Sequence, residues 1–491
     1  ATGVSNKARA EEQSEITKER FAEFFATEDS NNVPMPISFF DADYVKGESP
    51  AIPEENHEAS DYTWGSDLLD TFRQANFPDN VTFVVQPGGA MAWRDVQVNP
   101  NRNRRFVKQG DEFVEVYDAP VTSMGESDTL SDFLKFCKKN YPADHTMVIL
   151  TDHGGAMKGF GWDYIFGEDN LTLKELTTAF DDAYGLDEEN PTVDILYFNA
   201  CLMSNADVIN AMRGVSKYMI AGEEVGLSAT DYYRTLADRM NENPNMNPMQ
   251  LGKALIDCYC EDIATMFGPL GAPASTGMVL LDMTKAPKVY DAYADFAGKI
   301  LEDVADNPRL LAKLSRNVSE SVSFAVDSYK VYNCTDLGLW VDELKELYPK
   351  DSMKIVRLID DSVIYKRAYG YLMPAHGISV YYPRYVESMP GLLWALDYID
   401  EISYSEDISA LYYYKIAGCL NDKYKNYLKE KGIKEPEPID YGAMSKLRNS
   451  DITTTDESGN VKAKIDEALF PILTDVRYEL CKVNEYADTV T

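Results

Sequence analysis

The chain has 491 residues, and its 81 Asp and Glu against 47 Lys and Arg give a formal net charge of −34. Hydrophobic residues make up 45% and aromatic residues 12%, which is enough for a large core and excludes a chain that is disordered throughout. Because this much negative charge repels phosphates, nucleic acid is excluded as the main partner. No apolar run approaches the roughly 18 residues of a membrane-spanning helix, so we expect the mature chain not to be transmembrane.

Composition divides the chain into three parts. Residues 1–30 are rich in charge and hold phenylalanines at near-helical spacing, which predicts a tether followed by a docking helix. Residues 31–400 alternate apolar runs with helical patterns and are expected to form one large α/β domain with helical insertions. Residues 401–491 hold a Lys-rich helix, a Pro-containing linker and short strand-like runs, which predict a C-terminal accessory region that contains some β-structure.

In the first half, short and nearly continuous apolar runs predict buried parallel strands. These runs are Ile37–Phe40, Val81–Val85, Thr146–Thr151, Val193–Phe198 and Tyr218–Ala221. Amphipathic segments between them predict helices at Ser66–Gln74, Ser131–Lys139, Thr172–Tyr184 and Ser204–Met212. The third of these has a capping box, Thr172 with Glu175. The alternation predicts a doubly wound, mostly parallel sheet flanked by helices, with an inserted hairpin at Arg105–Val107 and Phe113–Val116.

After Pro244 helical patterns dominate. We expect helices at Met249–Met266, Ala286–Val304, Arg309–Leu314, Ser352–Ala368 and Leu420–Gly432, and strands at Thr276–Asp282 and Ile378–Tyr382. Most of these helices are the additional helical segments of the predicted α/β domain.

Two residues suited to catalysis each follow a predicted buried strand. His153 comes after Thr146–Thr151 and precedes two glycines, whose backbone N–H groups can approach a substrate oxygen. Cys201 follows Val193–Phe198 and precedes a predicted helix, whose dipole would lower the pKa of the thiol. Since the carboxyl ends of parallel strands share one edge of a sheet, the pair suits a nucleophile and its base. Taken singly, a structural histidine and a buried apolar cysteine remain the alternatives.

The other three histidines are less suited to this chemistry. His376 precedes its predicted strand, His57 lies in a polar stretch, and His145 lies on a loop before a strand. The sequence contains no GxSxG elbow of a serine hydrolase.

Around His153 and Cys201 the sequence resembles the clostripain family of cysteine peptidases, which belongs to the caspase-like clan. The resemblance lies in NVTFVVQPGG (80–89), YPADHTMVILTDHGGAMKGFG (141–161), LTLKEL (171–176), YFNACLM (197–203) and AGEE (221–224). It implies a caspase-like α/β fold and hydrolysis of peptide bonds, with Cys201 as nucleophile and His153 as catalytic histidine. It also implies that the backbone N–H groups of Gly154 and Cys201 hold the oxyanion.

In the family, acidic side chains favour Arg or Lys before the cut, and here the sequence departs. Asn199 stands where relatives usually carry Asp in an Asp-Ala-Cys motif, and an amide offers no charge to a cation. Asn199, Glu223 and Glu224 are the substrate-binding candidates. A solvated loop is the alternative for the two glutamates.

Two further family properties bear on this chain. Some members cut themselves between the histidine and the cysteine, and Lys158 is the expected site here, ahead of Lys174. Some members are assisted by calcium. The acidic pairs Asp181-Asp182 and Glu188-Glu189 do not form an EF-hand loop, so no metal site and no required cofactor is expected, with calcium as the alternative.

The predicted function is a secreted or cell-surface bacterial cysteine endopeptidase that acts as a monomer on peptide or protein substrates. A catalytically weak or inactive caspase-like binding or scaffold protein is the first alternative, because of Asn199 and the helical and C-terminal additions. A transpeptidase that uses the same dyad is the second.

Overall fold

A computed structural model describes residues 64–227, 230–267, 276–324, 334–382 and 405–439, together with the backbone of four short strands between residues 453 and 490. The tether and docking helix predicted for residues 1–30, the predicted strand Ile37–Phe40 and the histidine at position 57 lie outside the described residues. The domain boundary predicted after residue 400 does so as well.

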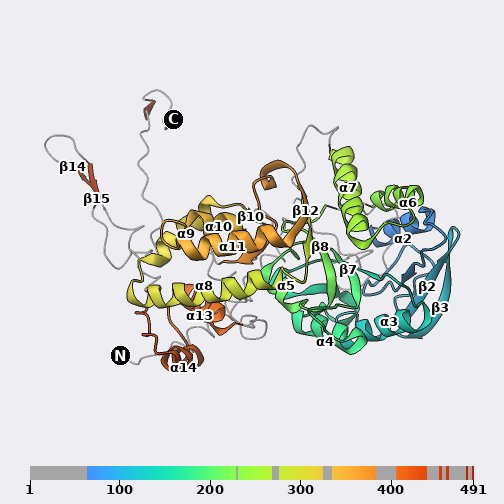
Figure 1. The fold of residues 1–491 in the computed structure, drawn as a ribbon, viewed down its shortest axis with the longest axis horizontal. Coiled ribbons are helices and arrows are strands. Elements are labelled where there is room, and N and C mark those ends of the chain that lie inside the picture. The colour runs from blue at the N-terminus through green and yellow to red at the C-terminus, as the bar shows by residue number, and fades with distance from the viewer. Residues whose placement is uncertain are drawn as a thin grey trace.

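A five-stranded sheet lies at the centre of the α/β part (Figure 1), in the order β12–β9–β8–β7–β4. Its strands are β4 (Met147–Thr151), β7 (Val193–Asn199), β8 (Ser216–Ala221), β9 (Gly277–Asp282) and β12 (Val363–Ala368). The strands β4, β7 and β8 pair in parallel, as the apolar runs predict. The strand β9 pairs antiparallel with β8 and with β12, so the sheet is mixed. The other four strands run in one direction, which confirms the mostly parallel sheet predicted from the sequence.

Helices cover both faces of this sheet. Along β7, which is buried throughout, Ile195 and Tyr197 pack toward α6 (Tyr232–Glu242) and α7 (Pro248–Phe267). The alternate residues Leu196 and Phe198 belong to the core that includes three helices on the other face: α4 (Leu173–Tyr184), α5 (Ala206–Ala211) and α8 (Pro287–Asp306). The predicted layering is therefore confirmed. The predicted capping box of α4 is present, since Thr172 Oγ1 accepts from the Glu175 N–H at 3.2 Å.

The predicted strand Val81–Val85 does not join the central sheet. Only β1 (Val84–Val85) forms, and it pairs antiparallel with β2 (Arg102–Gln109). The strand β2 pairs in turn with β3 (Glu112–Pro120), so the predicted hairpin is confirmed and β1 belongs to its separate sheet. A short apolar run such as Val81–Val85 indicates a strand, but it does not indicate the sheet with which that strand pairs.

The predicted helix Ser352–Ala368 is wrong in its last third. The helix α11 (Pro349–Ser362) ends where the β-branched and aromatic run Val363-Ile364-Tyr365 begins, and that run opens β12. Because β12 pairs along β9, the sheet's backbone hydrogen bonds override the helical pattern that precedes it.

The remaining elements complete the α/β part and the C-terminal region. They are α2 (Trp64–Gln74), α3 (Ser127–Asn140), β5 (Phe160–Asp163), β6 (Asp169–Leu171), α9 (Leu310–Glu320), β10 (Ser323–Phe324), β11 (Cys334–Asp336), α10 (Leu337–Glu343), β13 (Ser379–Tyr381), α13 (Glu406–Ala417) and α14 (Asp422–Lys431). Two antiparallel pairs lie near the C-terminus, β14 (Thr453–Thr455) with β15 (Val461–Ala463) and β16 (Val483–Asn484) with β17 (Thr489–Val490). They match the predicted β-containing region.

The helix α13 packs directly against the α/β part. The hydroxyl of Tyr412 lies 2.5 Å from that of Tyr293 on α8, and both rings are buried. Lys415 reaches Ser315 on α9 and is buried too, which lowers the pKa of its ammonium group to about 7. Residues 405–417 therefore share a core with α8 and α9.

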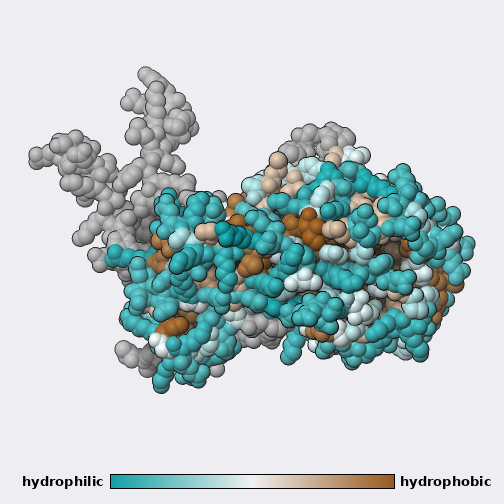
Figure 2. Space-filling model, viewed as in Figure 1, coloured by the Kyte–Doolittle hydropathy of each residue, from teal (hydrophilic) through white to brown (hydrophobic). Residues whose placement is uncertain are grey.

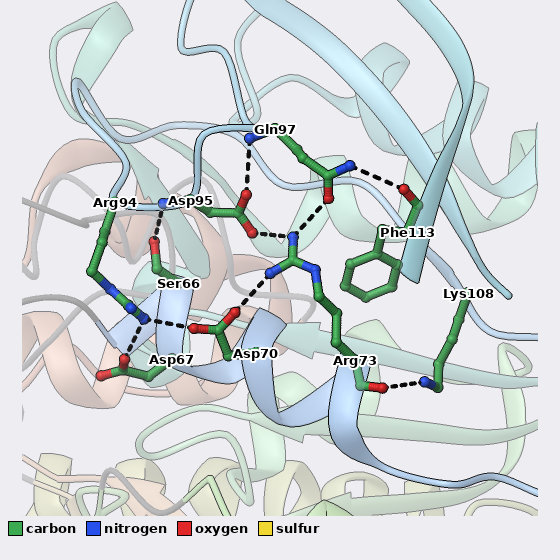
Figure 3. A network of polar contacts seen from close by, with 9 residues as sticks. All are labelled: Ser66, Asp67, Asp70, Arg73, Arg94, Asp95, Gln97, Lys108 and Phe113. Carbon is green, nitrogen blue, oxygen red and sulfur yellow. Dashed lines mark hydrogen bonds and ion pairs between the residues drawn. The ribbon is translucent and has the colours of Figure 1, made fainter. Parts of the chain in front are cut away.

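A polar network ties α2 to the sheet of β1, β2 and β3 (Figure 3). Arg73, in the last turn of α2, donates to Asp70 at 2.7 Å, to Gln97 at 2.9 Å and to Asp95. Its guanidinium also lies 5.1 Å from the ring centre of Phe113 on β3. The Asp95 side chain is only 4% exposed and accepts a second hydrogen bond, from the Gln97 N–H at 2.9 Å.

Replacing Asp95 is expected to weaken this network. Asp95→Ala leaves Arg73 without its most buried partner and should lower the free energy of unfolding by about 1–3 kcal/mol in a urea titration. Asp70→Ala is the control, because the Asp70 side chain is 41% exposed and its ion pairs should contribute less than about 1 kcal/mol. Equal losses in the two variants would contradict this account.

Candidate active site

The strands β4 and β7 bring the two predicted catalytic residues to one edge of the sheet. They are parallel neighbours, and their register pairs Thr151 with Asn199. His153 and Cys201 each come two residues after this last pair. The single crossover between the strands contains α4, as predicted.

Gly154 and Cys201 approach each other so closely that only glycine fits at position 154. A Cβ atom on Gly154 would lie 1.9 Å from the carbonyl oxygen of Cys201. The Gly154 N–H hydrogen-bonds to the Cys201 thiol, and the Gly226 N–H donates to the same Sγ at 3.2 Å. Two backbone N–H groups from different strand ends thus converge on the sulfur.

Cys201 does not lie at the start of a helix, contrary to the prediction. The helix α5 begins at Ala206, with Asn205 as its N-cap. Cys201 lies in a turn in which the next residue, Leu202, has a left-handed φ of 62°. This turn is fixed by hydrogen bonds from the Leu202 N–H to the Glu224 carbonyl (3.2 Å) and from the Ser204 N–H to the Gly222 carbonyl (2.9 Å).

The pKa of the Cys201 thiol is raised, and the predicted lowering is wrong. Burial raises this pKa to about 11, and the negative charges of Glu224 and Asp152 add to the effect. The N–H groups of Gly226 and Gly154 oppose it without cancelling it. The free thiol is therefore neutral at physiological pH.

His153 is positioned by its own backbone and by β5. Its carbonyl accepts from the Gly161 N–H at 3.1 Å, and its ring stands edge-on to Trp162 with 6.3 Å between ring centres. The carboxylate of Asp152, which is 4% exposed, accepts from the backbone N–H groups of His153 and Trp162. The sequence reasoning missed Asp152 and Trp162, although Asp152 stands directly beside His153 and Trp162 nine residues further on.

The three predicted substrate-binding residues have different surroundings. Asn199 is 8% exposed, and its Oδ1 accepts from the Tyr197 hydroxyl at 3.2 Å. That hydroxyl lies 3.1 Å from the hydroxyl of Tyr232 on α6. Asn199 therefore faces neutral hydroxyl groups on the side of the sheet that α6 and α7 cover.

Glu223 is directed toward a second acidic residue, Asp336. Burial raises the pKa of Glu223 well above its usual value, and the hydrogen-bonded Asp336 carboxyl group raises it further. Asp336 is fully buried, caps α10 through the Leu339 N–H at 2.7 Å, and lies 3.1 Å from Nδ1 of His376. His376 is thus engaged with the cap of α10, and Asp336 raises its pKa.

Glu224 faces Cys201. Its carboxylate accepts from the Val225 N–H at 2.7 Å and from the hydroxyl of Tyr371, and its charge raises the pKa of the Cys201 thiol. Of the two neighbouring glutamates, Glu224 is therefore the one whose charge acts on the Cys201 thiol, and Glu223 is directed toward the cap of α10.

A family model described as the clostripain family matches residues 79–409 of the chain. The chain belongs to the clostripain family. It is similar to clostripain from Hathewaya histolytica, with 30% identity over 105 residues. This match covers 18% of the chain and 19% of clostripain, so the chain spans about a fifth of that relative. The caspase-like α/β fold predicted from the resemblance is confirmed, with helices on both faces of a sheet whose parallel strands carry His153 and Cys201.

This clostripain-family chain is also similar to solved structures of C11 proteases. One is a secreted C11 cysteine protease of Bacteroides thetaiotaomicron in complex with an irreversible peptide inhibitor, which is 14% identical to this chain in sequence. The match has a TM-score of 0.43 and covers 65% of this chain and 86% of the protease chain. Another is an inactive zymogen C11 protease of Parabacteroides distasonis, which is 16% identical in sequence. This match has a TM-score of 0.46 and covers 70% of this chain and 92% of the zymogen chain. The assignment to the family rests on the sequence match.

The self-processing site expected from the clostripain family lies in an ordered turn. Lys158 ends a short 3-10 helix, η3 (Ala156–Lys158), and its carbonyl accepts from Asn170 Nδ2 at 2.8 Å. Burial lowers the pKa of the Lys158 ammonium group to about 8. Lys174 lies in the first turn of α4 and is exposed.

One carboxylate of each acidic pair, Asp181-Asp182 and Glu188-Glu189, forms an ion pair. Asp182 contacts Lys135, and Glu188 lies 3.3 Å from Arg213. Within the described residues, no group of three or more His, Cys, Asp or Glu side chains is arranged to hold a metal ion. In the same part of the chain, no helix has the length and apolarity needed to cross a membrane. The face shown in Figure 2 is mostly hydrophilic, with hydrophobic residues in small separate groups.

The contact between Gly154 and Cys201 can be tested by stability. Gly154→Ala forces the Cys201 turn to move and should lower the free energy of unfolding by about 2 kcal/mol in a urea titration. Gly226→Ala is the matched control, because a Cβ there would meet its nearest neighbours at 3.9 Å, an ordinary van der Waals distance. A Gly154→Ala variant as stable as Gly226→Ala would refute the close approach.

Proposed function

We propose that the chain is a cysteine endopeptidase in which Cys201 is the nucleophile and His153 is the general acid and base. The observation that carries this proposal is the pairing of β4 with β7, which places both residues just beyond one register pair in a member of the clostripain family. The two N–H groups directed at Sγ support it, because a backbone cradle around a thiol suits attack on a carbonyl.

The proposed reaction has two halves. The Cys201 sulfur bonds to the scissile carbonyl carbon while its proton passes to His153, and the oxyanion accepts hydrogen bonds from the N–H groups of Gly154 and Cys201. The C–N bond then breaks as His153 returns the proton to the leaving amine. In the second half, water loses a proton to His153 as its oxygen attacks the thioester carbon. The C–S bond then breaks, the acid product leaves, and His153 returns the proton to the sulfur, which restores the thiol.

The raised pKa of the Cys201 thiol affects the first half of the proposed reaction, in which the sulfur attacks the substrate carbonyl. A thiol with a pKa of about 11 holds very little thiolate at neutral pH, and the thiolate is the reactive form. Deprotonation by His153 must therefore accompany substrate binding or attack.

For the residue before the cut we propose Arg or Lys, held by Glu224. Glu224 is the predicted pocket residue whose charge acts on Cys201, whereas Asn199 faces tyrosine hydroxyls and Glu223 faces Asp336. A carboxylate beside the nucleophile can pair with a guanidinium or an ammonium group.

The proposed setting follows from the relatives. Similar C11 proteases are described as secreted and come from bacteria, which supports a secreted bacterial enzyme that acts on peptides or proteins. The net charge of −34 supports the absence of a nucleic-acid partner. A monomer and an assisting calcium ion stay predictions.

The dyad can be tested with a fluorogenic peptide library varied at the residue before the cut. Cys201→Ala and His153→Ala should each lower kcat/KM for the best substrate by at least about a thousandfold. Cys137→Ala, which removes a partly buried cysteine of α3, is the control and should keep the activity of the parent. Cleavage that survives Cys201→Ala would rule out the peptidase proposal, and no cleavage by the parent would favour a binding or scaffold protein.

The role of Asn199 has its own test. Asn199→Asp adds a carboxylate at the position where relatives usually carry one, but the side chain faces the hydroxyl of Tyr197 and is nearly buried. The ratio of kcat/KM for Arg and Lys substrates to that for matched neutral substrates should therefore change less than about twofold, as the same library measures. A rise of about tenfold would mean that the side chain at position 199 faces the pocket and would contradict the assignment of the pocket to Glu224 alone.

A further inference from the structure

Tyr371 covers the one predicted pocket carboxylate that faces the nucleophile. It lies in the short 3-10 helix η6 (Gly370–Leu372), which follows β12, and its side chain is about half exposed. Its hydroxyl donates to the carboxylate of Glu224, a residue that is only 8% exposed. The hydrogen-bond partner of this nearly buried carboxylate is thus a neutral hydroxyl on a half-exposed side chain.

Glu224 is linked to Cys201 through three consecutive residues. Its carbonyl accepts from the Leu202 N–H at 3.2 Å, its carboxylate accepts from the Val225 N–H at 2.7 Å, and the Gly226 N–H donates to Sγ at 3.2 Å. A change in the partner of the carboxylate therefore acts on the residues that hold the thiol.

We propose that Tyr371 occupies the place of the substrate's basic side chain on Glu224 in the free protein. An Arg or Lys before the scissile bond displaces the Tyr371 hydroxyl, neutralises Glu224, and so promotes ionisation of Cys201 by the correct substrate. This inference deepens the proposed function and rests on it.

The displacement is favoured by charge. The carboxylate accepts a hydrogen bond from either group, but a cation adds Coulomb attraction between opposite charges, and an Arg can form two hydrogen bonds with one carboxylate. Tyr371 can leave without loss of a buried group, because its side chain is half exposed. Its neighbour Leu372 is buried in a cluster with Leu202 and Ala375, which anchors the segment independently of the hydroxyl.

The effect on the thiol follows from the charges that face it. Burial and the carboxylates of Glu224 and Asp152 raise the pKa of the Cys201 thiol. Asp152 accepts hydrogen bonds from the N–H groups of His153 and Trp162, which hold it in place when substrate binds. A cation at Glu224 removes one of the two negative charges, which lowers the energy of the thiolate.

The first experiment compares peptides that differ only in Lys or norleucine before the cut. Tyr371→Phe removes the competing hydroxyl and should lower KM for the Lys peptide several-fold while KM for the norleucine peptide stays unchanged. Glu224→Gln should reduce the preference for Lys over norleucine at least about tenfold. Glu223→Gln is the matched control, because Glu223 faces Asp336, and it should keep the preference.

The second experiment follows Cys201 without turnover. The rate of its alkylation by iodoacetamide is measured against pH by peptide mass spectrometry, with and without saturating Nα-acetyl-lysine amide. The ligand should move the midpoint of the profile down by about one pH unit in the parent. The norleucine amide should not move it. In the Glu224→Gln variant, the midpoint of the alkylation profile should already lie at the lower pH without any ligand. Addition of the lysine amide should not lower that midpoint further.

The outcomes separate this inference from the proposed function. A midpoint that the lysine amide does not move, or moves equally in Glu224→Gln, overturns the inference. So does a Tyr371→Phe variant whose KM changes equally for both peptides. Cleavage that is lost in Cys201→Ala would leave the peptidase proposal standing in each of these cases, whereas cleavage that persists there removes both.

Discussion

The parallel pairing of β4 with β7 is the constraint on which the site depends. Its register brings Thr151 beside Asn199, so the two chain segments leave the sheet from neighbouring positions. Gly154 then meets the carbonyl of Cys201 at a distance that no other residue allows. The next parallel strand, β8, adds the segment from Gly222 to Gly226, which closes over the thiol from the other side.

The turn that holds the nucleophile is unfavourable both in backbone conformation and for ionisation of the thiol. Leu202 adopts a left-handed conformation that a β-carbon disfavours, and burial keeps the Cys201 thiol protonated. Hydrogen bonds from three directions hold the turn in place: the Glu224 carbonyl accepts from Leu202, the Gly222 carbonyl accepts from Ser204, and the Ser204 hydroxyl donates to the Gly377 carbonyl at 2.6 Å. The surrounding strands thus stabilise a conformation and a protonation state that the isolated turn would not keep.

The strand ends could be predicted from the sequence, whereas the surroundings of the thiol could not. Continuous apolar runs located β4 and β7, and the edge rule for parallel sheets placed His153 and Cys201 together. The start of α5 at Ala206 depends on Asn205, an N-cap that no apolar pattern reveals. The hydrogen bond to the Glu224 carboxylate is donated by Tyr371, which is 147 residues away in the chain. Tyr371 follows β12, a strand for which the sequence pattern predicts a helix.

The glutamates at 223 and 224 show why net charge says little about a site. Both are buried to the same degree, and both lie in the segment that follows β8. The chain bends at these two residues, and their carboxyl groups meet different partners: that of Glu223 meets Asp336, and that of Glu224 meets the Tyr371 hydroxyl. Despite an excess of 34 negative charges, Glu224 and Asp152 are the carboxylates whose charge acts on the nucleophile, because of their positions. The carboxylate of Glu224 opposes the thiolate until a cation approaches it, so the same charge that could bind a basic substrate also restrains the enzyme without one.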